Sequence, residues 1–197
     1  MCGGRGTRLG GETEKPLVEV CGTPMLDRVA SALRESRVET VRAVVSPNAP
    51  ETASRARDIG LATVETPGNG YVEDLRYALD SVGRPVVTVA ADVPLVTARH
   101  VDDAIAASKR VGGRGGDEDG EDDGFASVTV CVPAALKRRL GASVDTTFDR
   151  DGRELAPTGL NVVSESAADT VRVTYDARLA VNVNRPDDAE LAEDLCD

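Results

Sequence analysis

Glycine and arginine residues gather at the start of this chain, which begins MCGGRGTRLGG and continues, two residues later, with EKP. Glycines leave room for backbone N–H groups to converge on phosphate oxygens, and they accept the dihedral angles that such a loop needs. Arg5, Arg8 and Lys15 add positive charge to a chain whose formal net charge is −11. The pattern predicts a loop that binds a phosphate-bearing ligand, with a loose terminus as the alternative. It matches neither the Walker A spacing nor the dinucleotide-binding fingerprint.

A second candidate residue is Asp92, which follows the most strand-like stretch of the chain, PVVTVAA at 85–91. Ligands of open α/β sheets bind beyond the carboxyl ends of the strands. Magnesium prefers one or two carboxylates together with substrate phosphates. An aspartate here could also do no more than cap a turn. Together with the glycine-rich loop, however, it predicts a metal–nucleotide site.

The elements that must position these residues follow from hydrophobic periodicity. Short β-branched runs alternate with amphipathic stretches, which predicts one α/β domain over residues 1–197 with a mainly parallel sheet. Thr23 and Pro24 are expected to begin a helix as its N-cap and first helical residue. Strands are expected at 41–45, 85–91, 126–132, 160–163, 171–175 and 179–183, and further helices at 51–59, 72–82, 97–110 and from Pro186.

The charge balance argues against several classes of partner. Asp and Glu number 34 against 23 Lys and Arg, and this negative field repels nucleic acid and anionic membranes. Only Lys15, Lys109 and Lys137 are lysines, and this lysine-poor, acidic composition is typical of a cytoplasm with high salt, where charge is screened. Residues 112–124, GGRGGDEDGEDDG, predict a solvated surface loop without the ligand order of a calcium site.

Cysteine and histidine usage argues against a zinc site. Cys2, Cys21, Cys131 and Cys196 show no short paired spacing, so we expect reduced thiols in a cytoplasmic protein. The only histidine, His100, lies far in sequence from each cysteine, and we expect it on an exposed helical turn.

The segments around these residues resemble a known family. GGRGTRLGG with EKP is similar to the signature loop of nucleotidyltransferases that move a nucleoside monophosphate from an NTP, and AADVPLV is similar to their metal-binding strand end. VSPNAPET, TPGNGYVEDLRYAL, PTGLNVVS and LAVNVNRPDDAELAE, in that order, resemble the archaeal GTP:adenosylcobinamide-phosphate guanylyltransferases. The resemblance implies a Rossmann-like three-layer fold. It also implies GMP transfer from GTP to adenosylcobinamide phosphate, with GTP as co-substrate and Mg²⁺ as the metal.

The resemblance also implies roles for individual residues. Arg8, Lys15 and Asp92 would be catalytic, and Asp92 would hold the metal. Asn184 could instead only cap the last helix, and Gly159 could only serve a turn. Contacts to the nucleotide or acceptor are implied for Gly3, Gly4, Arg5, Gly6, Thr7, Ser46, Asn48, Gly68, Gly70, Gly159, Asn182 and Asn184.

Two departures and several alternatives accompany this interpretation. The family loop follows a hydrophobic first strand. No such strand precedes the loop in this sequence, so we expect a sheet with a truncated first strand. Position 2 is also Cys, where the family has a small Ala. The alternative functions are a molybdenum cofactor guanylyltransferase and a non-catalytic GTP-binding module. The partners expected are the two small substrates, without nucleic acid or membrane insertion, and a homodimer stays open.

Overall fold

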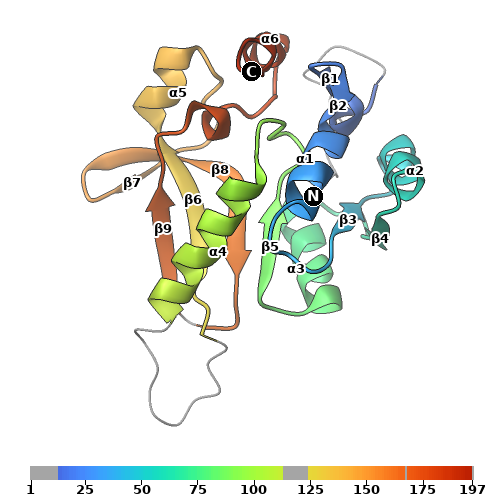
Figure 1. The fold of residues 1–197 in the computed structure, drawn as a ribbon, viewed down its shortest axis with the longest axis horizontal. Coiled ribbons are helices and arrows are strands. Elements are labelled where there is room, and N and C mark those ends of the chain that lie inside the picture. The colour runs from blue at the N-terminus through green and yellow to red at the C-terminus, as the bar shows by residue number, and fades with distance from the viewer. Residues whose placement is uncertain (1–12, 113–123, 167, 197) are drawn as a thin grey trace.

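The protein is described by a computed structural model over residues 13–112, 124–166 and 168–196. Its helices alternate with short strands along the chain (Figure 1). The helical elements are η1 (Lys15–Leu17), α1 (Met25–Arg34), α2 (Pro50–Asp58), α3 (Tyr71–Val82), α4 (Ala98–Gly112), α5 (Ala134–Leu140), η2 (Ala177–Ala180) and α6 (Pro186–Asp194). The strands are β1 (Glu19–Val20), β2 (Thr23–Pro24), β3 (Arg42–Val45), β4 (Ala62–Glu65), β5 (Val86–Val89), β6 (Ser127–Pro133), β7 (Phe148–Arg150), β8 (Arg153–Val163) and β9 (Asp169–Val173).

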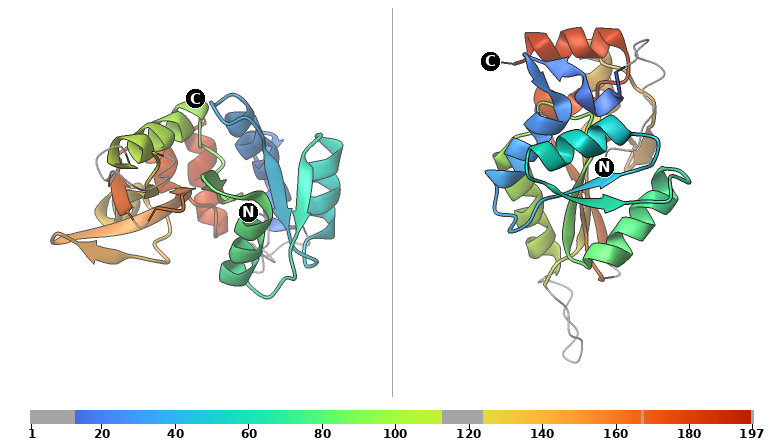
Figure 2. Two further views of the ribbon diagram at one scale, coloured as in Figure 1. Left: turned by 90° about the horizontal axis from the view of Figure 1, so that it is seen from below. Right: turned by 90° about the vertical axis from the view of Figure 1, so that its right-hand side faces the viewer.

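The sheets are organised around the long strand β8. It pairs antiparallel with β5, β6 and β7, while β6 and β9 are parallel, so this sheet is mixed and runs in the order β5-β8-β6-β9. Strands β3 and β4 form a separate parallel pair. Helices α1 and α4 lie on one side of the sheets and α3 on the other (Figure 2), which is the layered α/β arrangement that the sequence predicts.

The sheet is interrupted between β3 and β5. Among the described residues, no strand pairs with the edge of β3 away from β4 or with the edge of β5 away from β8. An apolar pocket of about 730 Å³ lies between them and is lined by Ala43 and Val44 of β3 and by Val87 and Val89 of β5.

Three apolar clusters hold the layers together. The largest joins α1 and α4 to β6 and β8, and a second packs α1 and α2 against β3. The third packs Val20 of the β1–β2 hairpin and Met25 at the start of α1 against Ala192 of α6, together with Val181 and Val183 from the connection before α6. This third cluster fixes α6 beside the hairpin that follows Lys15 (Figure 1).

Two local predictions are wrong. The 179–183 stretch forms η2 followed by extended chain instead of a strand, because its apolar side chains pack into the third cluster and the Val183 N–H bonds to the Asp92 carbonyl at 2.9 Å. Helix α1 begins at Met25, and Thr23 pairs in the hairpin instead of capping the helix. The turn of that hairpin has positive φ at Cys21 and Gly22, as a two-residue hairpin turn of type I′ requires.

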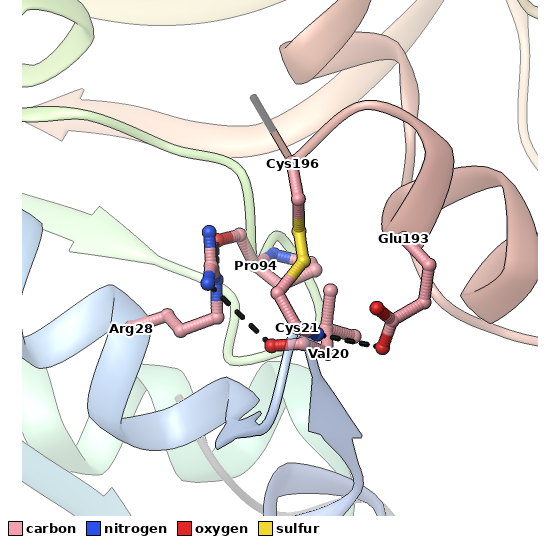
Figure 3. Close-up of a disulfide and its surroundings, with 6 residues drawn as sticks. All are labelled: Val20, Cys21, Arg28, Pro94, Glu193 and Cys196. Carbon is pink, nitrogen blue, oxygen red and sulfur yellow. Dashed lines mark hydrogen bonds between the residues drawn. A yellow bond between two sulfur atoms is a disulfide. The ribbon is translucent and has the colours of Figure 1, made fainter.

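The cysteine prediction also needs correction. Cys21, in the hairpin turn, and Cys196, after α6, are joined as a disulfide across 175 residues of sequence (Figure 3). Their separation in sequence hid this pairing, because the two segments meet only through the fold. Glu193 lies beside them and accepts a hydrogen bond from the Cys21 N–H at 2.6 Å. Cys131 is a buried free thiol, and burial raises its pKa to about 11.

His100 differs from the expected exposed residue as well. Its side chain is 10% exposed, its Nδ1 accepts a hydrogen bond from the Thr97 N–H, and its Nε2 lies 3.0 Å from Asp176. It therefore fixes the start of α4 against the chain before η2. In the described ranges, no helix has the length and apolarity needed to cross a membrane. The predicted acidic loop falls mostly on 113–123, outside the described residues.

Candidate active site

Lys15 and Asp92, two of the residues selected from the sequence, form an ion pair at the centre of the candidate site. The Lys15 Nζ donates to Asp92 Oδ2 at 2.6 Å and to Asn184 Oδ1 at 2.7 Å. The side chains of Lys15 and Asp92 are 17% and 21% exposed, so the ion pair is partly shielded from water but still reachable by a ligand. The fold thus brings together three residues that are far apart in the sequence.

The elements around this ion pair explain its position. Asp92 comes three residues after β5, and its backbone carbonyl is held by the Val183 N–H, just before Asn184. Lys15 opens η1, and the preceding residue, Glu14, accepts hydrogen bonds from the N–H groups of Glu51 and Thr52 at 2.9 and 2.7 Å. Glu14 therefore fastens the Lys15 segment to the first turn of α2, where a carboxylate also meets the positive end of the helix dipole.

Gly159 and Asn182 lie directly beside Asp92. The Asn182 Nδ2 donates to the Thr158 carbonyl at 3.0 Å and lies 3.4 Å from Asp92 Oδ1. Gly159 has φ +88°, and its carbonyl accepts a hydrogen bond from the Ala90 N–H at 2.9 Å. A Cβ at this position would lie only 2.9 Å from the Ala90 Cβ. Gly159 therefore allows β8 to approach the chain two residues before Asp92.

We expect Gly159→Ala to lower the free energy of unfolding by about 2–4 kcal/mol, because it adds a steric overlap to an unfavourable positive φ. The overlap also displaces Ala90, and we expect nucleotide-dependent turnover to fall with it. Urea unfolding and turnover of the folded variant measure the two effects. Gly152→Ala is the matched control, since Gly152 has φ +72° but no heavy atom within 4 Å of the added Cβ. Equal losses in both variants would contradict the close-approach argument.

The remaining predicted residues of the described chain gather in two loops. Ser46 and Asn48 follow β3, and Gly68 and Gly70 follow β4; because these strands are parallel, both loops leave the same edge. A Cβ on Gly68, whose φ is +78°, would lie 3.0 Å from Pro47 Cδ and 3.3 Å from Asn48 Nδ2, so the loops are in contact. The buried Ser46 hydroxyl has no hydrogen-bond partner within the described part of the chain.

Tyr71 follows Gly70 at the start of α3. Partial burial raises the pKa of its hydroxyl, and the negative charge of Asp92 raises that pKa further. The loop after β3 lies next to the Lys15 segment, because Glu14 is hydrogen-bonded to the first turn of α2, which begins directly after that loop.

Asp188 and Lys137 are buried side chains of the site that the sequence analysis did not select. Asp188 is 1% exposed and accepts hydrogen bonds from the N–H groups of Ser143, Asn184 and Arg185. It fixes the backbone of Asn184, and its place at N3 of α6 was a usable signal. Lys137 lies in AALKRRL, where nothing in the sequence separates it from surface arginines.

The oxygen atoms around Lys15 are suited to a hard cation. A carboxylate oxygen of Asp92 and an amide oxygen of Asn184 converge on the Lys15 ammonium, so the site already accommodates one positive charge. Oxygen ligands of this kind are those that Mg²⁺ prefers. Arg8 and the loop residues Gly3, Gly4, Arg5, Gly6 and Thr7 lie outside the described residues.

Comparisons with known proteins agree with this geometry. The MobA-like NTP transferase domain matches residues 1–143, which include Lys15 and Asp92. The chain belongs to the MobA-like NTP transferase family. It is therefore a nucleotidyltransferase that uses an NTP as co-substrate.

Two relatives that align over nearly the whole of this chain show the range of this family. Adenosylcobinamide-phosphate guanylyltransferase of Methanocaldococcus jannaschii is 29% identical over 99% of the chain and 94% of the relative. 2-C-methyl-D-erythritol 4-phosphate cytidylyltransferase of Frankia casuarinae is 33% identical over 98% of the chain and 77% of the relative. The two names share nucleotidyl transfer but differ in nucleotide and acceptor.

The fold of the MobA-like family is also found in a more distant solved structure. A putative glucose-1-phosphate thymidylyltransferase from Bacillus anthracis, solved with sucrose, aligns with a TM-score of 0.64 at 12% identity. The alignment covers 98% of this chain and 92% of that one. This confirms the Rossmann-like nucleotidyltransferase fold that the sequence predicts.

Proposed function

We propose that this protein transfers GMP from GTP to adenosylcobinamide phosphate, giving adenosylcobinamide-GDP and pyrophosphate. The observation that carries the proposal is the end-to-end match to the guanylyltransferase of M. jannaschii, which spans nearly all of both chains. The ordered segments around Ser46, Gly68, Gly159 and Asn182 agree with it. Asn182 and Gly159 lie beside Asp92. Ser46 and Gly68 lie in the two loops that follow β3 and β4 and contact each other.

The reaction needs little from the protein beyond positioning and charge neutralisation. The acceptor is a phosphate monoester, which is ionised near neutral pH, so its oxygen attacks without a protein base. The oxygen forms a bond to the α-phosphorus of GTP, the bond between the α- and β-phosphates breaks, and pyrophosphate leaves with the electron pair. Alignment of these groups and cancellation of developing negative charge then account for the rate enhancement.

In this proposal each residue of the site has a separate task. Lys15 and Arg8 offset the charge that develops on the α-phosphate and pyrophosphate, and the backbone of Gly3 to Thr7 contacts the other phosphates. Asp92, with the amide oxygen of Asn184, would hold Mg²⁺, which supplies Lewis-acid polarisation of the phosphate oxygens when it is bound. Ser46, Asn48 and Gly68 would position base and ribose.

A second candidate is transfer of CMP to 2-C-methyl-D-erythritol 4-phosphate, which the match to the Frankia relative favours. Both acceptors are phosphate monoesters, so the same arrangement of Lys15 and Asp92 serves either reaction. Only the surfaces that contact the base and the acceptor would differ.

Pyrophosphate release separates these functions. The purified protein is incubated with Mg²⁺ in concentrated KCl, with GTP or CTP, and with adenosylcobinamide phosphate, methylerythritol phosphate or molybdopterin as acceptor. We expect release with GTP and adenosylcobinamide phosphate only. Release with molybdopterin or with CTP and methylerythritol phosphate would replace the proposed substrates, and GTP binding without release would indicate a regulatory module.

A further inference from the structure

A buried lysine contacts Asn182, the residue that lies beside Asp92 in the candidate active site. Lys137, on α5, is 3% exposed, and its Nζ donates to the Ala180 carbonyl at 2.8 Å and to Asn182 Oδ1 at 2.9 Å. Burial lowers the pKa of this ammonium, and the nearby carboxylates of Asp188, Asp92 and Asp145 oppose that shift. Burying a charged group is costly unless it is hydrogen-bonded, and both hydrogen bonds of Lys137 go to the chain just before Asn184.

The contacts of Lys137 determine which way the Asn182 amide faces. An asparagine presents an acceptor oxygen on one side and a donor NH₂ on the other, while an ammonium can only donate. Because Lys137 holds Oδ1, the Nδ2 must face the opposite way, toward the Thr158 carbonyl and Asp92 Oδ1. A reversed amide would direct an oxygen at the Asp92 carboxylate and repel it.

The use of lysine in this chain gives a second argument. Only three of the 23 basic residues are lysines, yet two of the three, Lys15 and Lys137, lie on either side of the Asp92–Asn182 pair. The third, Lys109, lies over the ring of Phe125, away from the site. Arginine has a planar fork of five donors, whereas the buried position offers Lys137 two acceptors in a compact space.

We propose that Lys137 is a positioning residue for nucleotidyl transfer, which fixes the Asn182 amide and, through it, the Asp92 carboxylate that faces Lys15. The inference rests on the proposed function only in that Asp92 acts on the nucleotide or its metal. It does not depend on which base or acceptor the enzyme uses. Lys137 itself donates hydrogen bonds to Ala180 and Asn182, so its effect on Asp92 passes through Asn182.

A double-mutant cycle tests the proposal. We expect Lys137→Met, which keeps the side-chain length, to lower kcat about 10- to 100-fold and to change the KM for NTP by less than about threefold, since carboxylate orientation matters most in the transition state. In an Asn182→Ala background the same change should alter kcat by less than about twofold, because the link from Lys137 through Asn182 to Asp92 is already lost. Lys109→Met is the matched control and should retain full turnover.

A measurement without substrate keeps this test separate from the proposed function. In ¹H–¹⁵N spectra of the nucleotide-free protein, the Asn182 side-chain amide is assigned through its loss in Asn182→Ala. We expect it to shift in Lys137→Met and to stay in place in Lys109→Met. If Lys137→Met fails to fold, Lys137→Gln, which keeps an NH₂ donor on a shorter side chain, is used in both experiments. We then expect smaller changes in the same direction, and an unchanged kcat with an unshifted Asn182 amide would still overturn the proposal.

Three results would each overturn the proposal that Lys137 acts on Asp92 through Asn182: additive effects on kcat in the cycle, full turnover of Lys137→Met, or an unshifted Asn182 amide. A wild-type protein that uses another nucleotide or acceptor would overturn only the proposed substrates, and the cycle would then be run with that pair.

Discussion

Asp92→Asn is expected to lower kcat/KM for nucleotidyl transfer by about 10²- to 10³-fold while leaving the fold intact. The substitution keeps the shape of the side chain but removes the negative charge that meets the Lys15 ammonium at 2.6 Å. Loss of one preorganised charge or metal contact at a phosphoryl centre typically costs about 3–4 kcal/mol of transition-state stabilisation. Pyrophosphate release measured against Mg²⁺ concentration gives the size of the effect.

The control for this prediction is Asp80→Asn. Asp80 is an aspartate of α3 that is 64% exposed and lies 3.9 Å from Arg84, away from the site. Its replacement should leave kcat/KM within about twofold of the wild type. Equal activity of Asp92→Asn and Asp80→Asn would remove Asp92 from the catalytic machinery, and with it the argument that the carboxyl end of β5 forms the reaction centre.

Reduction of the disulfide is expected to lower the free energy of unfolding by about 2–5 kcal/mol. The bond closes a loop across 175 residues, so in the chain-entropy account it restricts the unfolded chain strongly. It also joins the hairpin after Lys15 to the end of α6, whose start adjoins Asn184. Urea unfolding with and without dithiothreitol measures the loss.

The Cys196→Ala variant provides the control, because dithiothreitol should not change its urea midpoint. Peptide mapping under non-reducing conditions should recover the segments of Cys21 and Cys196 as one cross-linked species. Recovery of both cysteines as free thiols from protein purified without any reductant would contradict the pairing. In that case the cysteines would be the reduced thiols that their spacing in the sequence predicts.

Local patterns predicted many of the helices and strands, and they singled out Lys15 and Asp92 as candidates. β-Branched runs located β3, β5 and β6, and periodic apolar residues located α3 and α4, because burial on one face leaves a direct trace in the sequence. Lys15 and Asp92 could be selected because a lysine beside a glycine-rich loop and an aspartate after a strand have specific chemical uses.

Features that depend on long-range contacts could not be predicted in this way. The 179–183 stretch has the composition of a strand, but its side chains fill a cluster formed by the hairpin and α6. The pairing of Cys21 with Cys196 arises only when the chain ends meet. Lys137 lies among arginines in a short helix, and only the folded chain shows that it faces inward toward Asn182.

The fate of the GTP phosphates tests the central claim most directly. The protein is incubated with Mg²⁺, adenosylcobinamide phosphate and GTP that carries ³²P at either the α- or the γ-position, and the corrinoid and pyrophosphate fractions are separated. Nucleotidyl transfer predicts that the α-label appears in the corrinoid product and the γ-label in pyrophosphate, with both signals strongly reduced in Asp92→Asn. Transfer of the γ-label to the acceptor, or transfer of the α-label that Asp92→Asn leaves unchanged, would contradict it.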